Sequence, residues 1–174
     1  MAGAADPVEP VRVRPALGAD AVALARIYSE SIRARDSTMD TEPTTHAETA
    51  SWLERLGPRE TLLVVEVEGT VRGWGIVKKY SDRPGYDRAC ETSVYLDRAW
   101  TRRGLGSLVQ RHLMAFCRSA GYHHLVAKIW ADNEGSVGMH RRFGYELVGV
   151  QREIGLVDGV RRDVAIFQCL IDID

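Results

Sequence analysis

ETSVYLDRAWTRRGLGS, residues 91–107, decides the fold, because an apolar strand runs into a basic glycine turn and then directly into a helix. Apolar residues recur at helical spacing from Leu105 to Phe116, so Gly104 and Gly106 lie at the helix N-terminus. The first backbone N–H groups of a helix have no internal partners and lie at the positive end of its dipole. The stretch therefore predicts a site for an anionic, phosphorylated ligand.

Length and composition set the class of protein. The chain has 174 residues, of which 27% are charged and 45% hydrophobic, and its formal net charge is -1. These values are typical of one globular domain, expected at residues 11–174 after a disordered leader at residues 1–10. The charge balance argues against a nucleic-acid partner, and the chain has neither a membrane-length apolar run nor an export-type start, so we expect a cytoplasmic protein. Three widely spaced cysteines favour reduced, buried thiols and no metal site.

The order of the elements favours an α+β fold with a mixed sheet and helices on both faces. Asp20 can cap the first helix, and Thr45 with Glu48 forms a capping-box pattern at the second. The two strands that flank the central helix must run parallel, because a helical crossover joins them. Strands are expected at residues 11–15, 61–67, 71–79, 89–96, 125–130, 145–154 and 160–171, and helices after residue 20 and near residues 45–56, 104–119 and 133–143.

The glycine turn matches neither common nucleotide motif. Arg102-Arg-Gly-Leu-Gly-Ser107 lacks the third glycine of a dinucleotide fingerprint and the Gly-Lys-Ser/Thr of a nucleoside-triphosphate loop. By itself it also fits a plain helix start with solvated arginines. A different phosphorylated cofactor is needed if the turn is functional.

The glycine turn and several other stretches of the chain, taken together in the order in which they occur, resemble the GNAT superfamily of acetyltransferases. Within it they resemble the phosphinothricin and methionine sulfone/sulfoximine N-acetyltransferase group. The turn is similar to the superfamily's Arg/Gln-x-x-Gly-x-Gly/Ala motif, with Thr101 where Arg or Gln is usual. The resemblance implies a twisted, mostly antiparallel sheet of about seven strands, a splayed parallel pair at residues 92–96 and 125–130, and a homodimer. The other matching stretches are Thr41–Pro43, Glu91–Tyr95, Asp132–His140, Phe143–Tyr145 and Gly159-x-x-x-Asp163.

The resemblance also implies the catalytic residues. Glu91 matches the group's proposed base, since acetyl transfer needs a neutral amine and a partly buried carboxylate can accept its proton. A strand-edge surface role is the alternative for Glu91. Alternation points Cys90 to the opposite face of the strand, so direct amine attack is favoured over an acyl-thiol route. His140 can protonate the leaving thiolate, or it can serve only in packing and hydrogen bonding.

Acetyl-CoA is the implied co-substrate. In this family the cofactor is bound by the glycine turn, by main-chain N–H groups of the splayed strand and by the start of the next helix. The resemblance carries these roles over to the matching positions of this chain. Asn133 and Ser136 can equally act as helix caps. The expected cofactor-binding residues are Val94, Tyr95, Leu96, Arg102, Arg103, Gly104, Leu105, Gly106, Ser107, Asn133 and Ser136.

The acceptor site is expected between residues 36–43 and 80–88. The group's carboxylate-binding Arg is replaced by Ser81, and a common Trp between the last two strands by Arg161. Trp74, Tyr80 and Tyr86 can line an apolar pocket or simply pack. The expected acceptor-binding residues are Tyr80, Ser81, Arg83 and Glu42.

The resemblance thus implies an acetyl-CoA-dependent N-acetyltransferase that modifies the primary amine of a small amino-acid-like compound or amine toxin in a ternary complex. Two alternatives are a protein or peptide N-acetyltransferase, which needs an open acceptor groove, and a non-catalytic acyl-CoA sensor.

Overall fold

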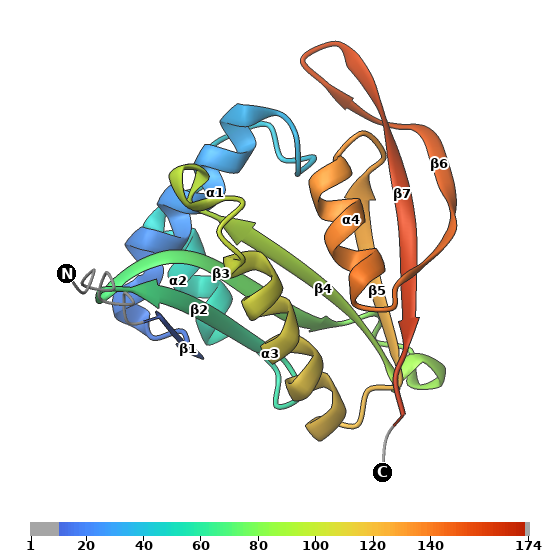
Figure 1. The fold of residues 1–174 in the computed structure, drawn as a ribbon, viewed down its shortest axis with the longest axis horizontal. Coiled ribbons are helices and arrows are strands. Elements are labelled where there is room, and N and C mark those ends of the chain that lie inside the picture. The colour runs from blue at the N-terminus through green and yellow to red at the C-terminus, as the bar shows by residue number, and fades with distance from the viewer. Residues whose placement is uncertain (1–10, 173–174) are drawn as a thin grey trace, which may run out of the picture.

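A single seven-stranded sheet forms the centre of the protein (Figure 1). The structure, a computed structural model, describes residues 11–172, so the leader expected at residues 1–10 lies outside the described residues. The strand order is β1-β2-β3-β4-β5-β7-β6, and every neighbouring pair is antiparallel except β4 and β5. The strands are β1 (Val11–Pro15), β2 (Thr61–Val67), β3 (Thr70–Lys79), β4 (Ala89–Leu96), β5 (His124–Trp130), β6 (Glu146–Val157) and β7 (Val160–Leu170).

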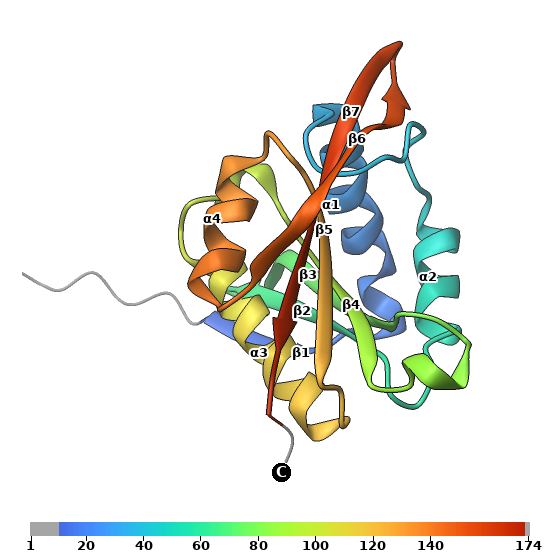
Figure 2. The same ribbon diagram turned by 90° about the vertical axis from the view of Figure 1, so that its right-hand side faces the viewer.

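Helices cover both faces of the sheet, as the sequence predicts (Figure 2). One face carries α1 (Ala21–Ala34) and α2 (His46–Glu54), and the other carries α3 (Leu105–Ser119) and α4 (Glu134–Arg142). Separate apolar clusters lie under the two layers, one centred on Leu113 and Phe167 and the other on Leu24 and Trp74. Among the helices described between residues 11 and 172, none is both long and apolar enough to cross a membrane.

Helix starts follow the sequence with one exception. The capping box before α2 is present, with the Glu48 amide donating to Thr45 and the Thr45 amide donating to the Glu48 carboxylate. Asp20 stands at the N-cap of α1, but its side chain makes no capping bond there. Its carboxylate instead accepts from the Arg14 guanidinium and from the Leu17 amide. The capping role expected for Asp20 is wrong, because a charged partner on β1 captures the carboxylate.

The parallel pair β4–β5 separates, as the resemblance implies. Main-chain pairing joins Ala89–Glu91 to His124–Val126 and then stops, so the strands diverge from Thr92 onward. The Asp97 amide donates to the Arg72 carbonyl of β3, and N–H directions alternate along a strand. The amides of Val94 and Leu96 therefore point towards the gap, whereas that of Tyr95 faces β3.

Candidate active site

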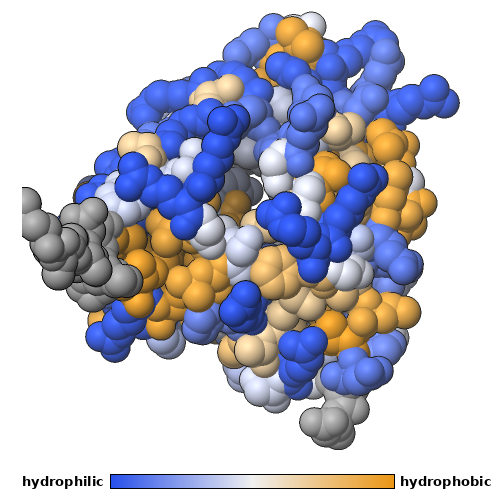
Figure 3. Space-filling model, viewed as in Figure 1, coloured by the Kyte–Doolittle hydropathy of each residue, from blue (hydrophilic) through white to orange (hydrophobic). Residues whose placement is uncertain are grey.

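A cavity of about 540 Å³ opens where β4 and β5 diverge. The surface is visibly hollowed between α1 and α4 (Figure 3). Its walls come from the end of β4, the turn before α3 with the first turn of that helix, one side of α4 along its length, and the end of α1 with the chain that leaves it. The lining residues are Ser31, Asp36, Ser37, Val94, Tyr95, Leu96, Arg98, Thr101, Arg102, Gly104, Gly106, Ser107, Asn133, Glu134, Gly135, Ser136, Gly138, Met139 and Arg142.

The cavity gathers most of the predicted cofactor-binding residues. Two of them do not line it. Leu105 is buried in the core beneath α3, and the Arg103 guanidinium lies 4.4 Å from the centre of the Trp100 ring. The Arg103 guanidinium thus stacks on an aromatic neighbour, and its role towards the cofactor stays a prediction. The nine that do line the cavity are Val94, Tyr95, Leu96, Arg102, Gly104, Gly106, Ser107, Asn133 and Ser136.

The start of α3 has the form of an anion cradle. Gly104 adopts a left-handed conformation (φ 80°) at the N-cap, and no side chain caps the helix. Arg102 is also left-handed (φ 61°), which is unusual for a residue with a side chain. A Cβ atom at Gly106 would lie 3.2 Å from the Met139 sulfur, so glycine keeps this corner open. The donor set and the missing side chains fit the diphosphate of a CoA ester.

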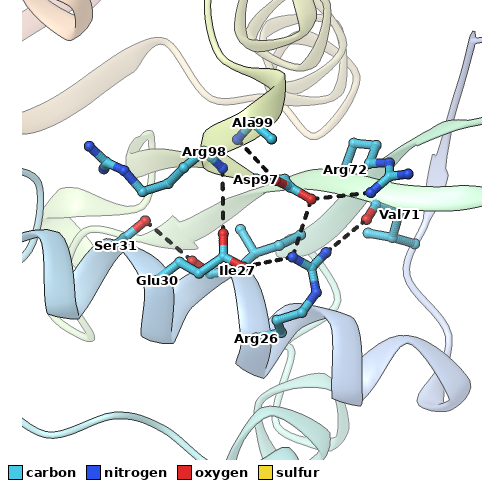
Figure 4. Close-up of polar contacts among 9 residues, drawn as sticks. All are labelled: Arg26, Ile27, Glu30, Ser31, Val71, Arg72, Asp97, Arg98 and Ala99. Carbon is cyan, nitrogen blue, oxygen red and sulfur yellow. Dashed lines mark hydrogen bonds and ion pairs between the residues drawn. The ribbon is translucent and has the colours of Figure 1, made fainter.

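A charged cluster anchors the turn that precedes this cradle (Figure 4). The nearly buried Asp97 carboxylate accepts from Arg26 of α1 (3.2 Å), from Arg72 of β3 (3.3 Å) and from the Ala99 amide (3.1 Å). Glu30 of α1 accepts from Arg26 and from the Arg98 amide. Asp97 thus ties the end of β4 to α1 and β3, which fixes the direction in which the chain enters the glycine turn.

Positive charge reaches the cavity from the turn before α3 and from α4. Thr101 replaces the family's usual Arg or Gln, and its hydroxyl donates to the Arg98 carbonyl. Arg102 from the turn and Arg142 from α4 both line the cavity. The sequence analysis did not name Arg142. A signal existed, since Gly135, Gly138, Met139 and Arg142 recur at the spacing of one helix face.

Asp36 crosses the open end of the splay and was also missed. Its carboxylate lies 2.8 Å from the Arg98 guanidinium, which follows β4. Its carbonyl accepts from the Asn133 side chain, which follows β5 (3.0 Å). The Asn133 oxygen accepts from the Ser136 amide and so caps α4. These ties join positions up to 97 residues apart, and no local pattern reveals them.

Glu91 lies at the last paired position before the splay and outside the cavity lining. It points away from α3, on the face that carries α1 and α2. Its side chain is 32% exposed, and its Oε2 lies 2.7 Å from the ammonium nitrogen of Lys128 on β5. The carboxylate is therefore partly solvated and ion-paired, three residues before Val94 on the same strand.

Cys90 points to the opposite face, as alternation predicts. It is fully buried with its sulfur 3.6 Å from that of Cys117. The hydrogen bond to Cys117, together with burial, raises the pKa of the Cys90 thiol far above its ordinary value. An acyl-thiol route would need a thiolate, which this environment disfavours.

His140 is buried beneath α4 and does not line the cavity. Burial lowers the pKa of His140, so the neutral ring is favoured. Its Nδ1 lies 2.8 Å from the Ser136 carbonyl and therefore donates, and Nε2 is buried with no partner among the described residues. The ring meets Tyr145 edge-on, and the Tyr145 hydroxyl contacts Thr92 and Gln110. These contacts support the packing and hydrogen-bonding role, while the acid role stays a prediction.

None of the predicted acceptor-binding residues lines the main cavity. Tyr80 and Arg83 are exposed, and Tyr80 stacks against Tyr86 with ring centres 5.4 Å apart. The Ser81 hydroxyl accepts from the Arg83 amide. Glu42 lines a separate cavity of about 600 Å³ beside α2.

Trp74 is buried in an aromatic cluster with Tyr28, Trp52 and Tyr95, so of the two alternatives it packs. Within residues 11–172, no cluster of three or more His, Cys, Asp or Glu side chains could hold a metal ion.

Sequence and structure comparisons agree with this geometry. The model of the acetyltransferase (GNAT) family matches residues 24–145. The chain belongs to the GNAT family, and it is an acetyl-CoA-dependent acetyltransferase.

Particular relatives are named for small-molecule acceptors. Phosphinothricin N-acetyltransferase of Streptomyces viridochromogenes is 36% identical over 91% of this chain and 87% of its own length. L-methionine sulfoximine/L-methionine sulfone acetyltransferase of Pseudomonas aeruginosa is 26% identical over 92% of this chain and 94% of its own. A phosphinothricin acetyltransferase structure from Sinorhizobium meliloti, in complex with acetyl-CoA, has a TM-score of 0.88 and 26% identity, covering 92% of this chain and 88% of that one.

Proposed function

We propose that this enzyme acetylates the primary amine of a small amino-acid-like molecule or amine toxin by direct attack within a ternary complex. One observation carries the proposal: pairing between β4 and β5 stops at Glu91, and the cavity opens on the same strand at Val94. A base and the amides that face the gap thus belong to one rigid element. The names of the relatives support the class of acceptor.

Residues of this chain would divide the work as follows. The first-turn amides of α3, with Arg102 and Arg142, would hold the diphosphate of the cofactor. The amides of Val94 and Leu96 would donate to acceptor groups in the gap between the strands. Bound acetyl-CoA would supply the activated acetyl thioester.

Glu91 would take the proton of the acceptor amine, directly or through a water molecule. Its Oε2 is paired with Lys128, and Oε1 has no partner within residues 11–172. Oε1 is therefore the oxygen we assign to the proton. General-base catalysis requires that this carboxylate be ionised.

A panel of acceptors tests the proposal. Release of free thiol from acetyl-CoA is followed with phosphinothricin, methionine sulfoximine, methionine sulfone, the standard amino acids and peptides with free N-termini, and products are identified by mass spectrometry. We expect turnover with at least one amino-acid-like amine and a strong loss in Glu91→Gln. Turnover with peptides alone would overturn the class of acceptor, and full activity of Glu91→Gln would remove Glu91 as the base.

The peptide arm is needed because one structure with a TM-score of 0.89 and 27% identity is titled a ribosomal-protein-alanine N-acetyltransferase, from Brucella melitensis; it covers 92% of this chain and 99% of that one.

A homodimer and a cytoplasmic location complete the proposal. Exposed apolar side chains of β6 and β7, among them Leu147, Val148 and Leu156, support a dimer surface. Arg161 lies on this hairpin, ion-paired with Glu153. Free Cys90, Cys117 and Cys169 are consistent with a reducing compartment. Light scattering on the purified protein tests the dimer, and localisation of a tagged chain tests the compartment.

A further inference from the structure

Lys128 is a charged residue of β5 that the sequence gives no reason to single out. Its ammonium nitrogen lies 2.7 Å from Glu91 Oε2. We propose that Lys128 is a positioning residue, which holds the Glu91 carboxylate in place beside the splay. The inference rests on the proposed role of Glu91 as the base.

The strand register explains why a side chain is needed for this task. Glu91 pairs with Val126 at the last position before β4 and β5 separate, and Lys128 stands two residues further along β5 on the same face. Beyond Glu91 the main chain no longer links the two strands. The Glu91–Lys128 ion pair continues the link through side chains and restrains the carboxylate at the edge of the gap.

Other titratable side chains stand on the same face of the sheet as Glu91 but are less well placed to pair with its carboxylate. Lys78 is its register partner on β3, Tyr95 shares its face on β4, and His124 shares its face on β5. From β7, Ile166 and Gln168 stand on this face opposite Lys128 and Val126, and neither is charged. Within residues 11–172, Lys128 is the cation that forms an ion pair with Glu91.

Lys128 has a defined place in proton transfer. Its ammonium group holds Oε2 of Glu91, which leaves Oε1 to accept the proton of the acceptor amine. When it does, an O–H bond forms on Glu91, an N–H bond of the acceptor breaks, and the electron pair of that bond stays on the acceptor nitrogen. Neutralised Glu91 no longer attracts Lys128, and loss of the proton to water restores the pair.

The test compares Lys128→Gln and Lys128→Arg with the unchanged enzyme. Lys79→Gln is the matched control, because Lys79 lies on the opposite face of β3 and pairs with Asp82. We measure kcat and KM separately for one acceptor amine, with acetyl-CoA affinity and melting temperature for each variant. The side chain of Lys128 is 49% exposed, so its replacement should leave the fold intact.

We expect Lys128→Gln to lower kcat by about tenfold with little change in the KM of the acceptor, because a base that leaves its productive position accepts the proton less efficiently. Lys128→Arg should restore most of kcat, and Lys79→Gln should leave it unchanged. An unchanged kcat in Lys128→Gln overturns the inference, including the case in which only the KM of the acceptor rises, since Lys128 would then bind the acceptor. If Glu91→Gln retains full activity, the proposed function itself loses its base, which is a separate outcome.

Discussion

Replacing Gly106 by alanine should affect the stability of the fold and the affinity for the cofactor in opposite directions. Gly106 is in the first turn of α3 and lines the cavity. A Cβ atom there would lie 3.2 Å from the Met139 sulfur and 3.4 Å from a Leu96 methyl carbon. Both neighbours are flexible side chains that can yield. Alanine in place of glycine stabilises a helix by about 0.5–1 kcal/mol, so the tight contacts should leave stability unchanged or slightly raised.

Cofactor affinity should change in the opposite direction. The methyl group would stand in the corner where α3 and α4 meet, which prevents close approach of a diphosphate to the first-turn amides. A hydrogen bond to a charged group contributes about 1.5–3 kcal/mol, so the loss of one bond predicts at least a tenfold weaker acetyl-CoA affinity.

Calorimetric titration with acetyl-CoA and a thermal melt measure the two effects on the same sample. For a chain of this size, 1 kcal/mol corresponds to about 2–4 °C in melting temperature, so we expect a rise of no more than about 4 °C. Arg111→Ala is the control, because Arg111 is exposed on α3 and lies outside the cavity lining. Wild-type affinity in Gly106→Ala would show that the turn is a helix start and not a phosphate cradle.

Three further substitutions test other parts of the structure. Asp97→Ala should destabilise the protein by about 2–3 kcal/mol, because it leaves the partly buried Arg72 without its carboxylate, and chemical denaturation should show the loss. Burial lowers the pKa of His140, so the unfolded chain binds the proton more readily and the protein loses stability as the pH falls below about 6.5. His140→Gln should make this loss of stability less steep. Thermal melts from pH 5 to 8 check this, and an unchanged slope would contradict it. Tyr28→Phe should cost about 1 kcal/mol by removing the hydroxyl that donates to Asp40 at 2.6 Å, and a melt that matches the parent would contradict that value.

The sequence predicted the elements whose causes are local. Helical periodicity and the capping box at Thr45 depend on residues a few positions apart, and the structure confirms them. The crossover between β4 and β5 followed from the rule that a helix joins parallel strands. The predicted splay at residues 92–96 followed from the resemblance, since no local pattern records where a strand pair separates.

Competition between partners explains what could not be predicted. Asp20 stands where the sequence predicts a helix cap, but Arg14 donates two hydrogen bonds to its carboxylate. Arg103 was expected to face an anion, and the stacking of its guanidinium on Trp100 could not be predicted from the sequence. Lys128 became relevant only when the register placed it beside Glu91. In each case the side-chain partner is known only from the folded chain and does not follow from the residue type.

Strand geometry explains how β4 combines the two tasks that we propose for it. Amides lie in the plane of a sheet and side chains stand perpendicular to it. The amides of Val94 and Leu96 therefore point sideways into the gap, while Glu91 projects towards the face that carries α1 and α2. A twist of β4 would displace both groups together. The Asp97 cluster at one end of the strand and the β5 pairing at the other thus fix the gap and the Glu91 carboxylate by the same contacts.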